Sequence, residues 1–271
     1  MRKFIPSLIA GAMCVSLYTA DAEATIVTLE TNVGPININL FDATTPETVE
    51  NFLNYVNNGS YDNTFIHRSV PNFVLQGGGF SYGTGIEAGF DGVVPFDPVV
   101  NEAKHSNVRA TIAMAKVSGN VNSATSQFFF NLVDNSANLD AQNGGFTVFG
   151  HIDDESMTVI DTIASYDRFD LSVASNSAAL GEVPLKDYSL TDATAGVVPG
   201  DDNFIIINSA TVTDAATDTA SGLTIVANPN YNPNPTNPGS GSGSGSSGGG
   251  GSLGAACVAL LGLMGLRRRR V

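Results

Sequence analysis

The sequence predicts a mainly β fold, a β-barrel capped at its ends by helices. Several short segments alternate apolar and polar residues, which is typical of strands with one buried face. Two stretches place apolar residues at helical spacing, and long connections separate the elements. Many strands, two helices and long connections together favour a capped barrel. We assign these elements to one domain, residues 25–213.

The first elements are a hairpin and a helix. Residues 25–31 alternate as a strand, and residues 32–34 (Asn-Val-Gly) turn the chain into a second strand over 35–40. The segment 44–47 (Thr-Thr-Pro-Glu) predicts a helix start, with a hydroxyl cap and a proline in the first turn. This helix has an apolar stripe and a terminating glycine, namely Val49, Phe52, Leu53 and Val56, then Gly59.

The remaining elements are five extended segments, a second helix and a last strand. The helix is predicted over 156–165 and the last strand over 204–212. Residues 81–108 are expected to cross the surface, and residues 167–203, rich in Ser, Ala, Asp and Gly, are expected to form a flexible excursion. The extended segments lie near 64–70, 73–78, 110–115, 127–132 and 146–152.

Both ends of the chain have the features of targeting signals. Two basic residues, an apolar run and small residues that fit an A-x-A cleavage site predict a secretory signal peptide over 1–24. Cys14 and Cys257 both lie in the terminal segments, so the folded region contains neither a disulfide nor a reactive thiol. Export without disulfides is typical of a bacterial protein.

The charge excludes one class of partner. The formal net charge is −14, and half of the 12 basic residues lie in the terminal segments, so the folded region is more acidic still. Such a surface repels phosphate backbones, and we expect no binding to nucleic acid.

The C-terminal region is predicted to be a linker followed by an apolar segment. Residues 214–252 form an Asn/Pro tract and then a Gly/Ser run, which cannot build a core. Residues 253–271 are an apolar stretch, shorter than the about 20 residues that span a bilayer, and an arginine cluster at 267–270. A glycine run, an apolar stretch and arginines in this order resemble the GlyGly-CTERM sorting signal of Gram-negative bacteria. The resemblance implies tail removal by an intramembrane rhomboid-like protease; the alternative is a permanent inner-membrane anchor.

The most informative stretch is 65–80, F-I-H-R-S-V-P-N-F-V-L-Q-G-G-G-F. If 64–70 and 73–78 are successive strands, Arg68, Phe73 and Gln76 can share one face. A cation beside an aromatic wall and an amide suits a site that grips an apolar residue and polarises the neighbouring carbonyl group.

Two further segments complete this pattern, M-A-K at 114–116 and S-Q-F-F-F at 126–130. Together with 65–80 they resemble the cyclophilin family of peptidyl-prolyl cis/trans isomerases in its bacterial form, and the resemblance spans about Thr25 to Thr213. It implies a closed barrel of eight antiparallel strands with two capping helices. It also implies that proline-containing polypeptides are the substrates.

The implied reaction needs no metal, cofactor or nucleophile. Rotation about a peptide bond has a barrier of roughly 18–20 kcal/mol because the C–N bond has double-bond character. As conjugation is lost, the proline nitrogen becomes a hydrogen-bond acceptor. A guanidinium placed there stabilises the transition state selectively, and this raises the rate.

The resemblance assigns a role to individual residues. Arg68 corresponds to the catalytic arginine, and Gln76 and Gln127 correspond to amides that orient it and bind substrate backbone. The remaining substrate-binding residues match the family's aromatic, M-A, Q-F-F and L-D positions or the pocket rim: Phe73, Met114, Ala115, Phe129, Leu139 and Phe146.

The sequence departs from the family pattern at three places. Phe65 and Ile66 stand in swapped order before His-Arg, which we expect to repack a core neighbour. Asn138 stands where eukaryotic members have a tryptophan that contributes to cyclosporin binding, so we expect low cyclosporin sensitivity. Phe146 replaces a histidine of eukaryotic members.

Neighbours of these residues have structural interpretations. Alternation sends Phe128 and Phe130 to the core and leaves Phe129 for the pocket. His67 is expected to point away from Arg68 and to satisfy a buried hydrogen bond. The three histidines show no metal-ligand spacing, so no metal site is predicted. The glycines at 77–79 predict a tight bend, and the acids at 153–155 an acidic helix start.

The leading hypothesis is a monomeric, exported isomerase that speeds the folding of envelope or secreted proteins. Its expected location is the periplasm, the outer surface or the outside of a Gram-negative bacterium. The alternative is a module of the same fold that binds proline peptides as a chaperone or surface binder without turnover. A passive structural domain is a third class, and it would require the pocket residues to be accidental.

Overall fold

The computed structural model describes residues 25–83, 90–215 and 223–235. The predicted signal peptide, the Gly/Ser run at 239–252 and the apolar segment with its arginines at 253–271 lie outside these ranges. Within them, no helix is long and apolar enough to cross a membrane.

Most of the strands join one antiparallel sheet, and a separate two-stranded ladder lies beside it. The strands of the main sheet are β1 (Ile26–Thr31), β2 (Pro35–Leu40), β3 (Thr64–Phe65), β4 (Arg68–Val70), β5 (Val74–Gly77), β6 (Phe80–Ser81), β7 (Asp91–Gly92), β8 (Thr111–Met114), β9 (Phe128–Asn131), β10 (Val148–Ile152) and β13 (Ile206–Asp214). The separate ladder is β11 (Arg168–Phe169) with β12 (Val183–Pro184). The helices are α1 (Pro46–Asn57), α2 (Ser136–Leu139), α3 (Asp154–Ser165), α4 (Ser172–Ser175) and α5 (Leu190–Thr194), with single-turn helices η2 (Gln142–Gly144) and η3 (Ala178–Leu180).

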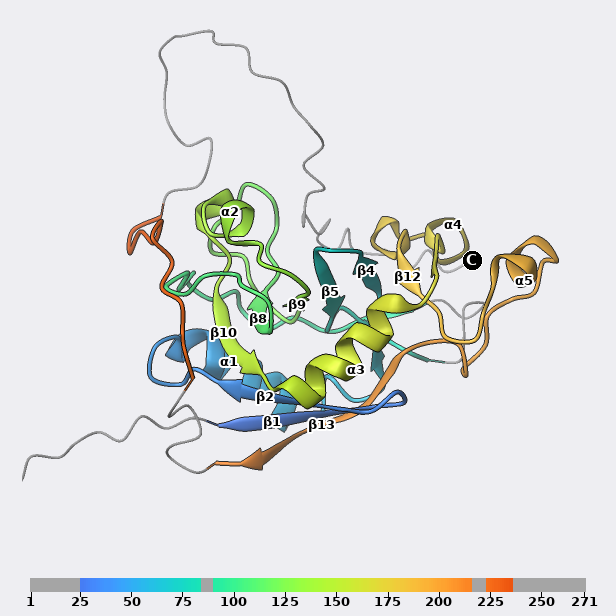
Figure 1. The fold of residues 1–271 in the computed structure, drawn as a ribbon, viewed down its shortest axis with the longest axis horizontal. Coiled ribbons are helices and arrows are strands. Elements are labelled where there is room, and N and C mark those ends of the chain that lie inside the picture. Colours follow the sequence, from blue (N-terminus) through green and yellow to red (C-terminus); the bar gives the residue numbers. More distant parts are fainter. Residues whose placement is uncertain (1–24, 84–89, 216–222, 236–271) are drawn as a thin grey trace, which may run out of the picture.

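The main sheet is strongly curled (Figure 1). Its order is β4-β5-β9-β8-β10-β2-β1-β13-β3-β6-β7, so the chain segment 64–70 takes part at two distant places: β3 pairs with β13 and β4 pairs with β5. The prediction of a mainly β, antiparallel fold is confirmed. The described sheet has eleven strands and not eight, because the ladders divide 64–70 and the stretch from Val74 to Ser81 into two short strands each, and because β7 pairs with β6 as an additional edge strand. Full closure of the barrel stays a prediction.

The two long helices are α1 and α3, as predicted, and they pack on β13 and β2 respectively. The expected hydroxyl cap of α1 is wrong: Thr45 caps no backbone N–H, and its hydroxyl donates instead to the Phe41 carbonyl at 3.2 Å. Helix α3 begins earlier than predicted, because the Asp153 carboxylate accepts from Ser156 N at 2.7 Å and stabilises an additional half-turn. Its acidic start is confirmed.

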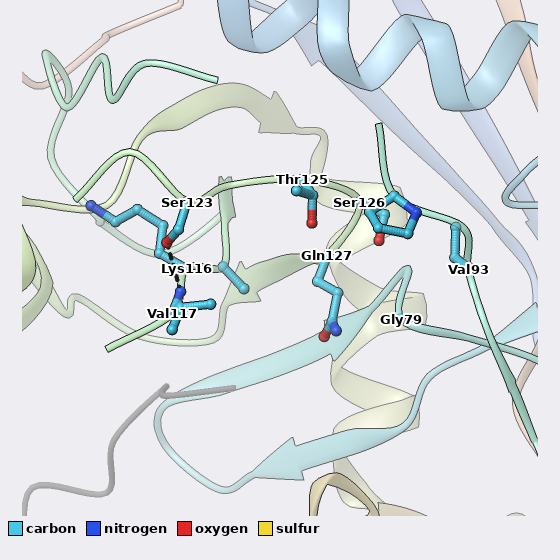
Figure 2. Close-up of a pocket in the computed structure, with 10 residues that line it drawn as sticks. Gly79, Val93, Lys116, Val117, Ser123, Thr125, Ser126 and Gln127 are labelled. Carbon is cyan, nitrogen blue, oxygen red and sulfur yellow. Dashed lines mark hydrogen bonds between the residues drawn. The ribbon is translucent and has the colours of Figure 1, made fainter. Parts of the chain in front are cut away.

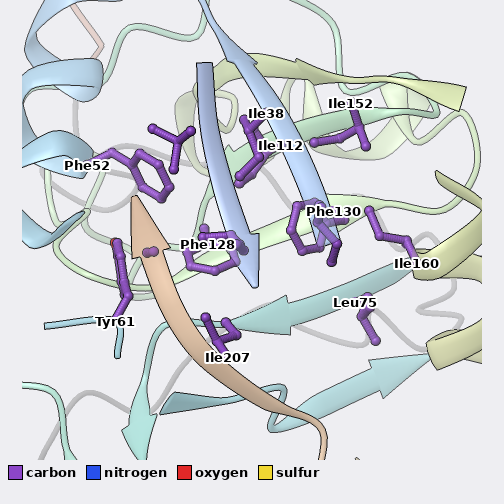
Figure 3. Close-up of a cluster of buried hydrophobic side chains, with 14 of the residues drawn as sticks. Ile38, Phe52, Tyr61, Leu75, Ile112, Phe128, Phe130, Ile152, Ile160 and Ile207 are labelled. Carbon is purple, nitrogen blue, oxygen red and sulfur yellow. The ribbon is translucent and has the colours of Figure 1, made fainter. Parts of the chain in front are cut away.

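One large apolar cluster fills the inside of the curled sheet, and we call it the main core. Phe52 of α1 makes edge contact with Phe128 of β9, with the ring centroids 5.8 Å apart. Ile160 of α3 reaches the same cluster from the other helix (Figure 3). Burial of such side chains contributes about 1.5–3 kcal/mol each relative to exposure, so the core holds both helices against the sheet.

Residues 167–203 are folded, so the expectation of a flexible excursion is wrong. They contain α4, η3, α5 and the β11–β12 ladder, and we call them the insert. Leu180 and Val183 of the insert pack with Phe65 of β3 and with Phe204, which precedes β13. The insert forms this separate cluster with a few apolar residues that stand among many small polar ones. The overall composition of 167–203 therefore did not predict that the segment folds.

Residues 223–235, part of the predicted linker, lie against the domain. Asn228 is buried, and its Nδ2 donates to the carbonyl oxygens of Ala103 and Asp140 at 2.9 and 3.0 Å. Ser106 N donates to the Val226 carbonyl at 2.8 Å. Two chain segments are therefore connected to this tail by hydrogen bonds, the 103–106 stretch and the end of α2.

Candidate active site

The strand pairing lines up four residues in one row across the sheet. Arg68 of β4 is paired with Gln76 of β5, Gln76 with Phe129 of β9, and Phe129 with Ala113 of β8. Directly paired residues of antiparallel strands project to the same face. The cation, the amide and one aromatic residue that the sequence assigned to the site therefore share a face of the sheet.

Alternation places the neighbours of this row on the opposite face. Phe128 and Phe130 belong to the main core, as predicted. Met114 also lies in the main core, so the structure does not bring it to the face of Phe129. Its neighbours Ala113 and Ala115 are on that face instead. Val74, two residues before Gln76 and on the same face, was missed by the sequence analysis; the period of two along β5 could have identified it.

A second apolar cluster surrounds Phe129, and we call it the Phe129 cluster. Leu139 is buried at the end of α2, and Phe146 follows it after a tight loop closed by the bond from Phe146 N to the Leu139 carbonyl, 3.0 Å. The rings of Phe129 and Phe146 meet edge to face at 5.8 Å, and Phe73 packs against the cluster from the β4–β5 turn. The cluster consists of Phe41, Val74, Ala113, Ala115, Phe129, Leu139, Phe146 and Val148.

The two glutamines contact each other beside this cluster. Gln76 Nε2 donates to Gln127 Oε1 at 3.1 Å, whereas the buried Gln76 Oε1 has no hydrogen-bond partner among the described residues. The glycine bend is confirmed. Gly78 has a φ of +74°, and a Cβ at this position would lie 2.6 Å from the Ser126 carbonyl oxygen, so the bend requires glycine there.

A cavity of about 350 Å³ opens next to Gln127. Ala115 and Gln127, both assigned to substrate binding, line it together with Val93 and Pro95 of the 81–108 connection. Figure 2 shows the Gln127 side chain extending toward Gly79, and Ser123 and Thr125 on the segment that leads to it. The cavity extends the site beyond the Phe129 cluster along the chain that precedes β9.

Lys116 supports the loop that carries Phe146. It is only 2% exposed, and its Nζ donates to the carbonyl oxygens of Asn143 and Gly145 at 2.8 and 2.6 Å. The same Nζ lies 5.0 Å from the centre of the Phe146 ring. Burial lowers the pKa of Lys116 to about 7. The sequence shows Lys116 only as part of the M-A-K motif, and no local pattern predicts this supporting role.

The hydrogen-bond partner of Arg68 differs from the expected one. Arg68 Nε donates to Glu182 Oε2 of the insert at 3.0 Å, and no hydrogen bond joins Arg68 to Gln76 or Gln127 among the described residues. Next to it, His67 is fully buried, and burial together with the charge of Arg68 lowers its pKa to about 3. His67 contacts Phe80 edge to face at 5.1 Å. Neither ring nitrogen of His67 has a hydrogen-bond partner of full geometry in the described part of the chain, although interactions with the Phe65 backbone and the Gln127 side chain oppose the lowering of its pKa. The buried hydrogen bond expected for His67 stays a prediction.

Comparisons with known proteins identify the family of the chain. The model of the family "Cyclophilin type peptidyl-prolyl cis-trans isomerase/CLD" matches residues 26–193. The chain is 38% identical over 162 residues to a peptidyl-prolyl cis-trans isomerase of Acinetobacter baylyi, which covers 59% of this chain and 81% of that protein. It is 42% identical over 144 residues to peptidyl-prolyl cis-trans isomerase B of Escherichia coli, covering 51% and 83%. A crystal structure of a Cryptosporidium parvum cyclophilin type isomerase matches with a TM-score of 0.47 at 21% identity, covering 70% of this chain and 98% of that one. The family match contains every strand from β1 to β12, both long helices and every residue of the candidate site, and this chain therefore belongs to the cyclophilin type peptidyl-prolyl cis-trans isomerases.

Proposed function

We propose that Arg68 is the catalytic group of this isomerase and that the Phe129 cluster, Phe73 and the Gln76–Gln127 pair bind the proline-containing segment. The observation that carries the proposal is the row formed by Arg68, Gln76 and Phe129 across three neighbouring strands. A permanent cation, an amide and an aromatic ring side by side suit the binding and twisting of an X-Pro bond. They suit a reaction that requires a nucleophile or a proton transfer less well.

The mechanism follows from what changes as the bond twists. The planar amide delocalises the lone pair of the proline nitrogen, and the twisted amide returns it. A guanidinium N–H directed at that nitrogen forms a hydrogen bond that exists only near the transition state, so it accelerates rotation without tightening ground-state binding.

The side chains around Arg68 have complementary roles in this scheme. The apolar residues hold the proline ring, which leaves the peptide bond at the edge of the cluster where the row begins. The Gln76 amide, with an unused acceptor at Oε1, is suited to receive an N–H of the substrate backbone. No step requires a proton relay, so neither His67 nor Lys116 enters the reaction.

The test is an isomerase assay on a proline tetrapeptide with the wild-type chain and Arg68→Ala. We expect kcat/KM to fall about 100- to 1000-fold, the usual cost of removing one transition-state donor, with circular dichroism unchanged. Binding of the tetrapeptide is measured in parallel. Peptide binding by the wild-type chain without turnover would favour the alternative, a non-catalytic proline-peptide module.

We further propose that the protein is exported and sorted through its two terminal signals, and that it acts as a monomer on X-Pro bonds of exported proteins. The sequence of the termini supports this proposal. Mass spectrometry of the mature chain tests it: removal of residues 1–24 supports export, and a C-terminus within 239–252 supports cleavage by an intramembrane protease. A mature chain that retains 267–270 would instead indicate a permanent anchor.

A further inference from the structure

The insert is attached to β4, the strand that carries Arg68. Ser69 N donates to the Glu182 carbonyl at 2.8 Å, and strand β12, which begins at Val183, packs against β4. Figure 1 shows β12 next to β4. Packing stabilises this attachment, because Val183 and Leu185 are buried in the cluster around Phe65. The position of Glu182 is therefore determined by packing and by a backbone bond.

The side chain of Glu182 contacts Arg68, the residue before Ser69. Its Oε2 accepts from Arg68 Nε at 3.0 Å, with the Arg68 side chain 16% and the Glu182 side chain 44% exposed. Exposed ion pairs with free side chains contribute little, because holding two long side chains in place costs entropy. This pair differs from them, since the backbone of Glu182 is already bonded to β4.

The bond leaves the reactive part of the guanidinium free. Arginine has five N–H donors in a planar fork, and Glu182 takes the one at Nε. The terminal amino groups of Arg68 have no hydrogen-bond partner in the described part of the chain. Gln76, although paired with Arg68 in the ladder, directs its Nε2 to Gln127 instead. Glu182, and neither glutamine, thus fixes the plane of the guanidinium.

We propose that Glu182 is a positioning residue for the isomerase reaction, which holds Arg68 by its Nε–H so that the terminal N–H groups are presented to the proline nitrogen. This inference rests on the proposed catalytic role of Arg68. A free arginine side chain populates many rotamers and loses entropy when it is held in one of them. A carboxylate that restricts the side chain before substrate arrives removes part of that cost from the transition state, which is how a preorganised donor gains its effect.

The experiment combines single and double variants of the full chain. Glu182→Ala is expected to lower kcat about three- to tenfold with KM nearly unchanged, because orientation accounts for part of what the donor supplies. Glu182→Gln should lose less, since an amide oxygen still accepts from Nε. The matched control is Asp187→Asn, a carboxylate of the same insert whose side chain is 80% exposed, and it should retain wild-type kcat.

Two readouts separate positioning from a structural role. In the Arg68→Ala background, measured by exchange NMR at high enzyme concentration, adding Glu182→Ala should cause no further loss. In the wild-type background, the Arg68 Hε resonance should exchange with solvent faster once Glu182 is replaced by either Ala or Gln, with the larger change for Ala.

The possible results distinguish the positioning role of Glu182 from the catalytic role of Arg68. An unchanged or increased kcat in both Glu182 variants would overturn the proposal, and so would an equal further loss in the Arg68→Ala background. If Glu182→Ala does not fold, Glu182→Gln decides the question by the same two readouts. Wild-type turnover by Arg68→Ala alone would instead overturn the proposed function on which the inference rests.

Discussion

Arg68 and Gln76 are directly paired across β4 and β5, yet no hydrogen bond joins their side chains in the described structure. Each bonds elsewhere, Arg68 to Glu182 and Gln76 to Gln127, and Gln76 Oε1 is left as a buried acceptor without a partner among the described residues. A buried acceptor without a partner costs about 1–3 kcal/mol. We infer that this acceptor is kept for the substrate, and the first prediction tests that inference.

Gln76→Met should therefore separate stability from activity. Replacing the amide by an apolar side chain of similar length removes the unpaired oxygen, so the free energy of unfolding should stay the same or rise. kcat/KM should fall about tenfold, which corresponds to about 1.4 kcal/mol, the scale of one hydrogen bond to the substrate. Urea denaturation and the tetrapeptide assay give the two quantities. A variant with wild-type kcat/KM would show that Gln76 does not contact the substrate.

The two faces of the sheet predict different effects for Val74 and Met114. Val74→Ala removes side-chain volume from the Phe129 cluster, on the same face as Arg68 and Gln76. KM should therefore rise, while the free energy of unfolding falls only modestly. Met114→Ala leaves a cavity in the main core, so it should destabilise the protein by about 2–5 kcal/mol with KM of the folded protein unchanged. Comparing KM and urea midpoints of both variants checks this. The reverse pattern, with Met114 controlling KM, would support the original assignment from the sequence.

Lys116 should make stability depend on pH. Burial lowers its pKa to about 7 in the folded protein, whereas the unfolded chain has the ordinary lysine value of 10.5. Between these values the unfolded chain binds more protons, so the free energy of unfolding should rise as pH increases from about 7 toward 10.5. Each unit of pKa difference corresponds to about 1.4 kcal/mol at most.

Urea melts of the wild-type chain and Lys116→Met across this pH range isolate the contribution of Lys116. The variant lacks the buried amine, so the rise should be smaller or absent. Equal slopes for the two proteins would mean that Lys116 is not the group responsible.

The tail segment should stabilise the domain through Asn228. Asn228→Ala leaves the carbonyl oxygens of Ala103 and Asp140 without this donor, and we expect a loss of about 1–3 kcal/mol. Asn230→Ala, an exposed position in the same tract, is the control and should melt like the wild type. Identical melting of both variants would show that residues 223–235 do not stabilise the fold.

Local sequence patterns were sufficient for much of the fold and part of the site. The alternation at 128–130 assigned each phenylalanine to its face, as predicted. Phe73 reaches the Phe129 cluster from the β4–β5 turn, whereas strand alternation alone would place it on the face opposite to Gln76. The same alternation applied to β8 would have excluded Met114 and favoured Ala113 and Ala115. The resemblance of the M-A segment and the period of the strand therefore disagree on Met114, and the comparison of KM values decides between them.

Glu182 could not be predicted, because it lies 114 residues from Arg68 in sequence. A contact of this kind depends on how the insert packs against β4. Composition suggested flexibility for 167–203, whereas a few apolar residues among many small polar ones are enough to fold it onto Phe65 and Phe204. Similarly, the buried position of Asn228 follows from a tertiary contact that no local pattern encodes.

The measurement that tests the central claim most directly is the rate of cis/trans exchange of a proline peptide bound to saturating enzyme, followed by exchange NMR for the wild-type chain and Arg68→Ala. If Arg68 stabilises the twisted amide, the bound exchange rate should fall about 100-fold or more while the dissociation constant of the peptide changes little. An unchanged exchange rate in the bound state would contradict the assignment of Arg68 as the catalytic group.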